Sequence, residues 1–284
     1  KPLVLLNERC TNAVMGDDLE ALKRSCQEAA GCPVIAMSLK SEDAHDTFGS
    51  LFQIAFGRGQ PFDVPGEPLS VNLFDFPQSY RDSELLPMLR ELGLKPNVSL
   101  FPEWDMDTLR RLPAAYLQVF CGQATTETSI RKLLAGVPRT TLTVPPPYGV
   151  EGTRECLRLI AGAAGREEAF QQLWDRRRQT WSDAWDALRR RAGSYRLAFV
   201  ADENSFPNLL KPRFGQGPAL LKTVLEMGFG VDVLLYAPEG RFARPPQSGK
   251  SLRFEMFRNP AELERRLREG EFHAVYSDIF FDWR

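Results

Sequence analysis

The sequence lacks the short motifs that identify several common enzyme classes. It has no Gly-x-x-x-x-Gly-Lys-Ser/Thr loop, so the chain is not expected to hydrolyse ATP itself. No Gly-x-Gly-x-x-Gly follows an expected strand, which disfavours a nicotinamide cofactor. Only two histidines, His45 and His273, are present, and neither His-Glu-x-x-His nor a paired Cys-x-x-Cys occurs. A Ser-His-Asp triad and a self-contained zinc site are therefore both disfavoured.

Charge of one sign and long apolar runs are also missing. The formal net charge of −1 gives no electrostatic basis for binding nucleic acid or an anionic membrane. No apolar run approaches the roughly 20 residues that span a bilayer. The five cysteines are an odd, scattered set, which argues against a disulfide framework. We therefore expect a reduced, cytoplasmic protein with neither a nucleic-acid nor a membrane partner.

The pattern that the chain does contain is an alternation of short apolar runs with amphipathic stretches. This alternation predicts βαβ units, and hence an α/β fold of consecutive Rossmann-like domains with mainly parallel sheets. Strands are expected at 3–6, 34–37, 70–74, 98–101, 116–120, 140–144, 197–200 and 231–236. Helices are expected at 17–30, 83–92, 126–134, 152–161, 167–192 and 218–227.

Two changes in composition predict domain boundaries. Proline and glycine cluster at Gly57–Pro68, and Gly193-Ser194 follows a long charged helix pattern. The predicted domains are the C-terminal part of a first Rossmann-like domain at 1–65, a second domain at 66–193 and the start of a third at 194–284. The chain begins on a strand pattern without Met and stops just after the strand-like Ala274-Val275-Tyr276, so we expect a fragment of a longer polypeptide.

The predicted helix at 167–192 combines tryptophans with arginines. Trp174, Trp181 and Trp185 follow one another at spacings that place all three near one face of the helix. Two arginine triplets, at 176–178 and 189–191, lie in the same helix. We expect a packing face with solvated arginines rather than a stacking platform for nucleic acid.

Cys10 and Cys121 are the candidate functional residues. Each follows an apolar strand pattern and precedes a helix, which is where open α/β sheets collect ligands. A single cysteine at a strand end is usually a small buried apolar residue, but two in equivalent positions favour a ligand role. The other three, Cys26, Cys32 and Cys156, are interpreted as structural.

Other polar segments have simpler interpretations. Asp17 and Asp18 stand where they would cap the helix that they begin. The acidic stretch at 103–107 is interpreted as a solvated loop. Gly215-Gln216-Gly217 precedes a helix and could leave amides open to an anion, but a plain tight turn is the favoured interpretation.

The segment Arg9-Cys10-Thr11-Asn12-Ala13-Val14-Met15-Gly16-Asp17-Asp18 resembles the Cys-x5-Gly-Asp-Asp segment of the nitrogenase component 1 family. In that family the cysteine ligates an iron–sulfur cluster shared between two homologous subunits, either a P-cluster or a [4Fe-4S] cluster. The resemblance implies this metal-ligand role for Cys10 and a homologous second subunit that shares the cluster. The family's two further cluster cysteines are expected before residue 1.

A second segment, Leu117-Gln118-Val119-Phe120-Cys121, resembles the second α/β domain of the same family, as does the tract at 145–153. There a cysteine binds a terminal iron of a large iron–sulfur metallocofactor, so the resemblance implies metal and cofactor binding at Cys121. The resemblance covers essentially the whole chain, as the end of a first domain, a complete second domain and the start of a third. A further histidine ligand is expected after residue 284.

The resemblance implies an enzyme: a catalytic-component subunit of a nitrogenase-like reductase in a heterotetramer. A separate ATP-hydrolysing iron protein would deliver electrons to the cluster near Cys10, and the cluster would pass them to a substrate or metallocofactor site near Cys121. One alternative is a non-catalytic scaffold on which a nitrogenase-type metallocofactor is assembled. A second alternative is a metal-free binding protein or transferase that uses an inter-domain crevice. Relatives act on dinitrogen, tetrapyrroles and organosulfur compounds, and Cys121 favours a large iron–sulfur cofactor over an organic tetrapyrrole.

Overall fold

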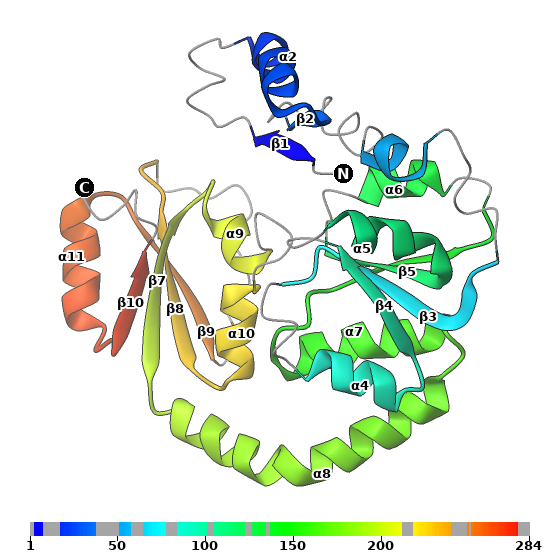
Figure 1. Cartoon of the computed structure of the whole chain (residues 1–284). Coiled ribbons are helices and arrows are strands. Elements are labelled where there is room, and N and C mark those ends of the chain that lie inside the picture. Colours follow the sequence, from blue (N-terminus) through cyan, green and yellow to red (C-terminus); the bar gives the residue numbers. More distant parts are fainter. Residues whose placement is uncertain are drawn as a thin grey trace. The chain divides into compact units, whose positions relative to one another are not determined.

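The computed structural model has an α/β fold with two four-stranded parallel sheets and a separate pair of parallel strands (Figure 1). The predicted fold class is therefore confirmed. The structure describes residues 3–7, 18–37, 51–57, 65–77, 84–100, 105–122, 127–134, 137–211, 218–239, 249 and 251–277. Within these residues, no helix combines the length and apolar character needed to cross a membrane.

The chain divides into two compact units, each described by itself. The first unit contains residues 1–81 and 93–143, and the second contains residues 82–92 and 144–284. The three domains expected from composition, at 1–65, 66–193 and 194–284, stay a prediction.

The first unit holds the strand pair and one of the four-stranded sheets. In the pair, β1 (Val4–Asn7) runs parallel to β2 (Val34–Met37), and α2 (Leu19–Ala30) connects them. The sheet has the order β4-β3-β5-β6, with β3 at Glu67–Phe74, β4 at Lys95–Leu100, β5 at Ala115–Cys121 and β6 at Thr140–Val144. Residues 51–56 are helical, as are α5 (Met106–Arg111), the short 3₁₀ turn η2 (Leu112–Ala114) and α6 (Glu127–Leu133).

The core of the first unit forms on the two central strands. Phe74 of β3 and Phe120 of β5 are partners in the strand register, and their rings stack with centroids 4.7 Å apart. Leu100 of β4 and Ile35 of β2 belong to the same apolar cluster. Nearly continuous burial along β3 and β5 is typical of parallel strands covered on both faces.

A buried amide network lies two residues before this aromatic pair along β3 and β5. Asn72 donates to the Leu112 carbonyl at 2.8 Å and to Gln118 Oε1 at 2.9 Å, while its own oxygen accepts from Asn97 Nδ2 at 2.9 Å. Asn97 also donates to the Arg111 carbonyl, and Gln118 donates to the Ala115 carbonyl. The network therefore ties β3, β4 and β5 to the turn that precedes β5.

The second unit holds the other four-stranded sheet, in the order β10-β7-β8-β9. Its strands are β7 (Arg196–Asp202), β8 (Gly230–Tyr236), β9 (Leu252–Phe257) and β10 (Ala274–Ser277). Its helices are α4 (Leu85–Glu91), α7 (Gly149–Ala163), α8 (Glu167–Ala192), α9 (Phe206–Leu210), α10 (Leu220–Glu226) and α11 (Pro260–Glu269).

Alternating residues of this sheet face two different apolar clusters. Phe199, Val231 and Val233 pack with α9 and α10 on one face. Ala198 and Val200 belong to a cluster that α11 joins from the other face. Figure 1 shows the same arrangement, with α9 and α10 on one side of the sheet and α11 on the other. This alternation follows from the period of two in a β-strand.

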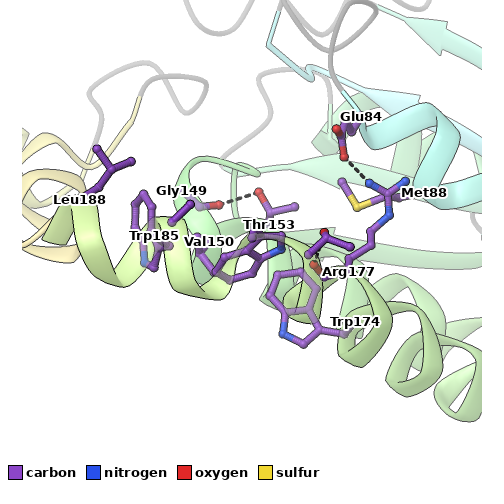
Figure 2. Close-up of a pocket in the computed structure, with 12 residues that line it drawn as sticks. Glu84, Met88, Gly149, Val150, Thr153, Trp174, Arg177, Trp185 and Leu188 are labelled. Carbon is purple, nitrogen blue, oxygen red and sulfur yellow. Dashed lines mark hydrogen bonds and ion pairs between the residues drawn. The ribbon is translucent and has the colours of Figure 1, made fainter.

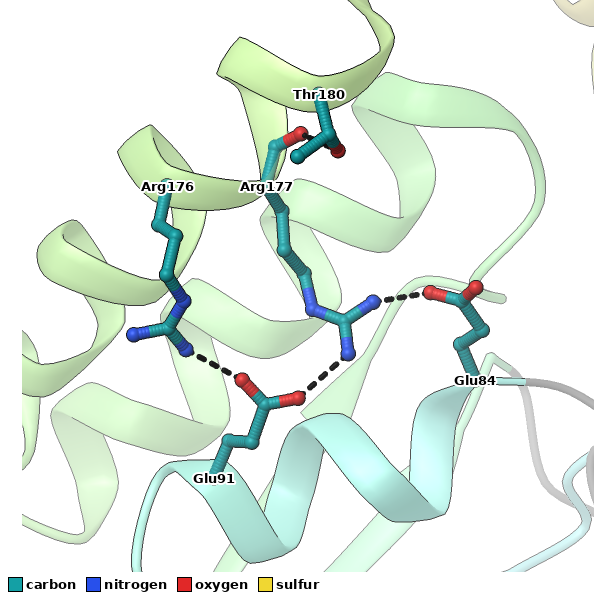
Figure 3. A network of polar contacts seen from close by, with 5 residues as sticks. All are labelled: Glu84, Glu91, Arg176, Arg177 and Thr180. Carbon is teal, nitrogen blue, oxygen red and sulfur yellow. Dashed lines mark hydrogen bonds and ion pairs between the residues drawn. The ribbon is translucent and has the colours of Figure 1, made fainter.

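The first half of α8 is fastened to α4 by ion pairs (Figure 3). Arg177 donates to Glu91 at 2.5 Å and also pairs with Glu84, while Arg176 pairs with the other oxygen of Glu91. Hydrogen bonds from Arg177 hold the pKa of the Glu91 carboxyl below its ordinary value. The arginines of this helix were predicted to be solvated, but Arg176 and Arg177 form ion pairs with Glu84 and Glu91.

The N-terminus of α7 is capped by a side chain from another helix. Glu226, the last residue of α10, accepts hydrogen bonds from the backbone amides of Val150 at 2.6 Å and Glu151 at 3.1 Å. Tyr148 occupies the N-cap position and forms no side-chain capping bond. A carboxylate at this end also interacts favourably with the helix dipole.

Candidate functional site

The strand order of the first sheet identifies where a ligand would bind. The chain passes from β3 to β4 on one side of β3, and then crosses to place β5 on the other side. The carboxyl ends of β3 and β5 therefore flank the point where the winding direction reverses, the usual ligand position in an open α/β sheet. Phe74 pairs with Phe120, so Asp75 and Cys121 come next at this edge.

Cys121 is the last residue of β5 and is fully buried. Burial raises the pKa of its thiol to about 12, and the negative charge of Asp75 adds to this rise. The predicted strand-end position is confirmed. Without a metal the group is a neutral thiol at physiological pH, and a neutral thiol is a weak nucleophile.

Asp75 places a carboxylate beside Cys121. It is buried and has a φ of 56°, a left-handed backbone conformation that Asp tolerates better than most residues. Its backbone amide donates to the Leu100 carbonyl at 3.0 Å, which fixes the turn after β3 to the neighbouring strand. Asp75 was not among the residues expected from the sequence, because only the pairing of β3 with β5 brings it to Cys121.

A second charged group, Arg131, lies on α6, the helix that follows β5, and it contacts residues of β6. The Arg131 guanidinium carbon stands 5.6 Å from the centroid of the Phe120 ring. Arg131 also donates to Glu127 at 2.8 Å and to Thr141 Oγ1 at 2.5 Å, and Thr143 donates to the same Glu127 oxygen at 2.6 Å. Nothing in the local sequence pattern singles out Arg131.

The donors present test whether this edge fits a metal group. A thiol is the donor type that iron–sulfur groups use. Among the described residues, however, no three His, Cys, Asp or Glu side chains gather closely enough to hold a metal ion. The high pKa of Cys121 also means that the metal's own charge would have to displace the proton. Cys121 thus fits a single ligand of such a group, and this edge alone does not complete one.

The other predicted residues fall in different places. Cys10 lies outside the described residues, as do His45, Asp17 and the glycine turn at 215–217. Asp18 caps α2 as predicted, since its Oδ1 accepts from the Ala21 amide at 2.9 Å. Cys26 lies within α2, Cys32 is buried just before β2, and Cys156 is buried within α7, consistent with structural roles.

The second sheet has its own winding reversal, between β7 and β10. A cavity of about 240 Å³ lies there, and it is lined by Val200, Ala201, Ser205, Asn208, Leu209, Pro218, Leu220 and Tyr276. Asp202 Oδ1 accepts from the Asn204 and Ser205 amides at 3.1 and 2.7 Å, so this carboxylate is engaged within its own turn. The cavity is below the usual size of a site for a drug-sized ligand, about 300 to 1,000 Å³.

Alkylation provides a direct test of the Cys121 environment. In the folded, metal-free protein at pH 8, we expect Cys121 to react with iodoacetamide at least about a thousandfold more slowly than an exposed thiol, because so little thiolate is present. Cys26, which is only partly buried on α2, serves as the internal comparison. Mass spectrometry of tryptic peptides over time measures both rates. Equal rates at Cys26 and Cys121 would contradict the burial described here.

Comparison with known proteins places the chain in a family. A family profile described as nitrogenase component 1 type oxidoreductase matches residues 2–211. Two solved structures, described as nitrogenase Cp1 at pH 6.5 and at pH 5, are 13% and 14% identical to the chain, each with a TM-score of 0.53. Both cover 98% of this chain, and the chain covers 59% and 58% of theirs.

At this level of identity the two structures show a shared fold. The chain spans about three fifths of the length of these nitrogenase chains. No curated protein matches it at a significant level. The profile match extends over well more than half of the sequence, from β1 to the end of α9. The chain therefore belongs to the nitrogenase component 1 type oxidoreductase family.

Proposed function

We propose that this chain is part of a subunit of a nitrogenase-like reductase. In this proposal, an ATP-dependent iron protein supplies electrons, an iron–sulfur cluster receives them, and a substrate or metallocofactor site uses them. The observation that carries the proposal is the position of Cys121, a thiol at the winding reversal of a parallel sheet in a chain of this family. The four described cysteines form no disulfide with one another, which supports action in the reducing cytoplasm.

Two cysteines would hold the metal groups. Cys10 would ligate a cluster of the [4Fe-4S] or P-cluster type, which a homologous second subunit in a heterotetramer completes. Cys121 would ligate a larger iron–sulfur metallocofactor. When bound, these groups supply the acceptance and release of single electrons. The chain itself contributes burial around Cys121 and the fixed ring pair of Phe74 and Phe120 beside it.

Metal analysis of cysteine variants tests the proposal. The full-length protein is produced with its homologous subunit, purified without oxygen and measured for iron and by EPR. We expect Cys10→Ala to lose the cluster signal and Cys121→Ala to lose the iron of the larger group. Cys156→Ala is the matched control, because Cys156 is equally buried but lies within the helix α7. Its iron content should equal that of the wild type.

The same preparation distinguishes the alternatives. Iron that depends on both cysteines, but no turnover of any substrate with an iron protein, would assign the chain to an assembly scaffold. Absence of iron from the wild-type complex would overturn both the reductase and the scaffold. The remaining candidate is then a metal-free binding protein, which the neutral, buried thiol of Cys121 favours.

A further inference from the structure

An open cavity of about 510 Å³ runs along α8 from Trp174 to Leu188 (Figure 2). Its walls come from α8, from the first turns of α7 and from α4, all within the second unit. The lining residues that bear on its chemistry are Glu84, Trp174, Arg177, Trp181, Ala184 and Trp185. This volume lies within the range of about 300 to 1,000 Å³ that is usual for small-molecule sites.

Three tryptophans form one wall of this cavity. Trp174, Trp181 and Trp185 are all only partly buried, and the rings of Trp174 and Trp181 meet edge to face with centroids 6.3 Å apart. Figure 2 shows Trp185 beside Val150 of α7, and Trp174 farther along α8 near Arg177. Leu188 extends the apolar wall and is 58% exposed. The predicted shared face of the tryptophans is confirmed, and part of that face remains open.

Arg177 lines the cavity, but its charge is already paired. Its two terminal nitrogens bond to Glu84 and Glu91, so this ion-pair network forms one side of the cavity. Unpaired positive charge near the tryptophans therefore has to come from other arginines of α8.

Further positive charge borders the same tryptophans. A second hollow of about 290 Å³ shares Val150, Trp174, Trp181 and Trp185 with the first. Arg178 and Arg189 line it and lie about three helical turns apart, on the same face of α8. Neither forms an ion pair with another described residue, whereas Arg154 stands 3.9 Å from Glu151. The acidic side chains that line this second hollow are Glu151 and Asp186.

We infer that this cavity binds a small planar aromatic acid. The indole rings offer surfaces on which a planar aromatic ring can stack. Arg178 and Arg189 line the adjoining hollow that shares these tryptophans, and they favour a negative charge there. The lining is built from α4, α7 and α8, so the inference does not depend on Cys10 or Cys121.

Titration with 2-naphthoate tests the inference on the full chain. We expect saturable quenching of tryptophan fluorescence and one site per chain by calorimetry. Ala184 lines the cavity and is exposed, so Ala184→Tyr should fill the space and weaken binding by about tenfold or more. Ala187→Tyr is the matched control, because Ala187 is exposed on the same helix outside both linings and should bind as the wild type does.

A neutral probe tests the role of charge. We expect 2-naphthamide to bind about fivefold or more weakly than 2-naphthoate, and Arg178→Gln to reduce that difference. Failure of 2-naphthoate to give saturable binding at millimolar concentration would overturn the inference, as would equal binding by Ala184→Tyr and the wild type. A wild-type dimer that Ala184→Tyr converts to a monomer in sedimentation would assign the groove to a second copy of the chain, and would also overturn it.

Discussion

Phe120→Ala is expected to lower the free energy of unfolding by about 3 to 5 kcal/mol, the cost of replacing a buried phenylalanine with alanine in a close-packed core. Phe120 is fully buried, stacks on Phe74 and lies beneath the Arg131 guanidinium. Truncation removes both ring contacts and leaves a cavity at the centre of the first sheet. The loss should also loosen the β5 carboxyl end that carries Cys121.

Urea denaturation followed by circular dichroism measures this effect. Tyr116→Ala is the matched control, because Tyr116 lies on the same strand but is 42% exposed. A surface change of this kind should cost no more than about 0.5 kcal/mol. A loss at Phe120 no larger than that at Tyr116 would show that the stacked pair does not support the sheet.

Asn72→Leu is expected to lower the free energy of unfolding by about 2 to 3 kcal/mol, although leucine has a similar size and is more apolar. The cost arises because the Leu112 carbonyl and the Gln118 side-chain oxygen lose their donor in a buried site. Thermal and denaturant unfolding of the purified variant measure the change.

The double variant Asn72→Leu, Gln118→Leu gives the sharper test. Each single variant leaves the other amide without its partner, whereas the double variant removes both amides. The double variant should therefore lower the free energy of unfolding by less than the sum of the two single variants. Asn204→Leu is the control, because the Asn204 side chain is exposed in the turn after β7. Strict additivity would argue against an energetically coupled network.

Local signals predicted several elements well. The helix at 167–192 has the expected bounds, as do the strands at 34–37 and 140–144. Gly31 adopts a φ of 60° at the end of α2, which is the left-handed C-cap geometry that its position before a new strand indicates. Helical periodicity and capping residues involve only residues that are close together in the sequence, so the sequence alone can reveal them.

Short or polar elements were harder to predict. The acidic stretch at 103–107 was expected to be a solvated loop, but Asp105 caps α5 by accepting from the Thr108 amide at 2.6 Å. A six-residue helix is too short to show apolar periodicity. The strand β9 and the helix α11 were not expected at all, since β9 is only half-buried and α11 has no fully buried residue.

The candidate site shows the same division. Cys121 was found from a local pattern, a cysteine that ends an apolar strand and precedes a helix. Asp75 could not be found in this way, because its relation to Cys121 depends on β3 lying beside β5. That order results from long-range pairing, which leaves no mark in the spacing of residues along the chain.

The strand orders of the two sheets limit how the sheets can be compared. The chain reverses direction after one added strand in the first sheet, but after two added strands in the second. The two sheets therefore cannot be superposed strand for strand in chain order. Their equivalent points are the turns after β3 and β7, the strands from which each sheet grows in both directions. Asp75 directly follows β3 and Asp202 is the last residue of β7, so each sheet carries an aspartate at the carboxyl end of the strand that has neighbours added on both sides.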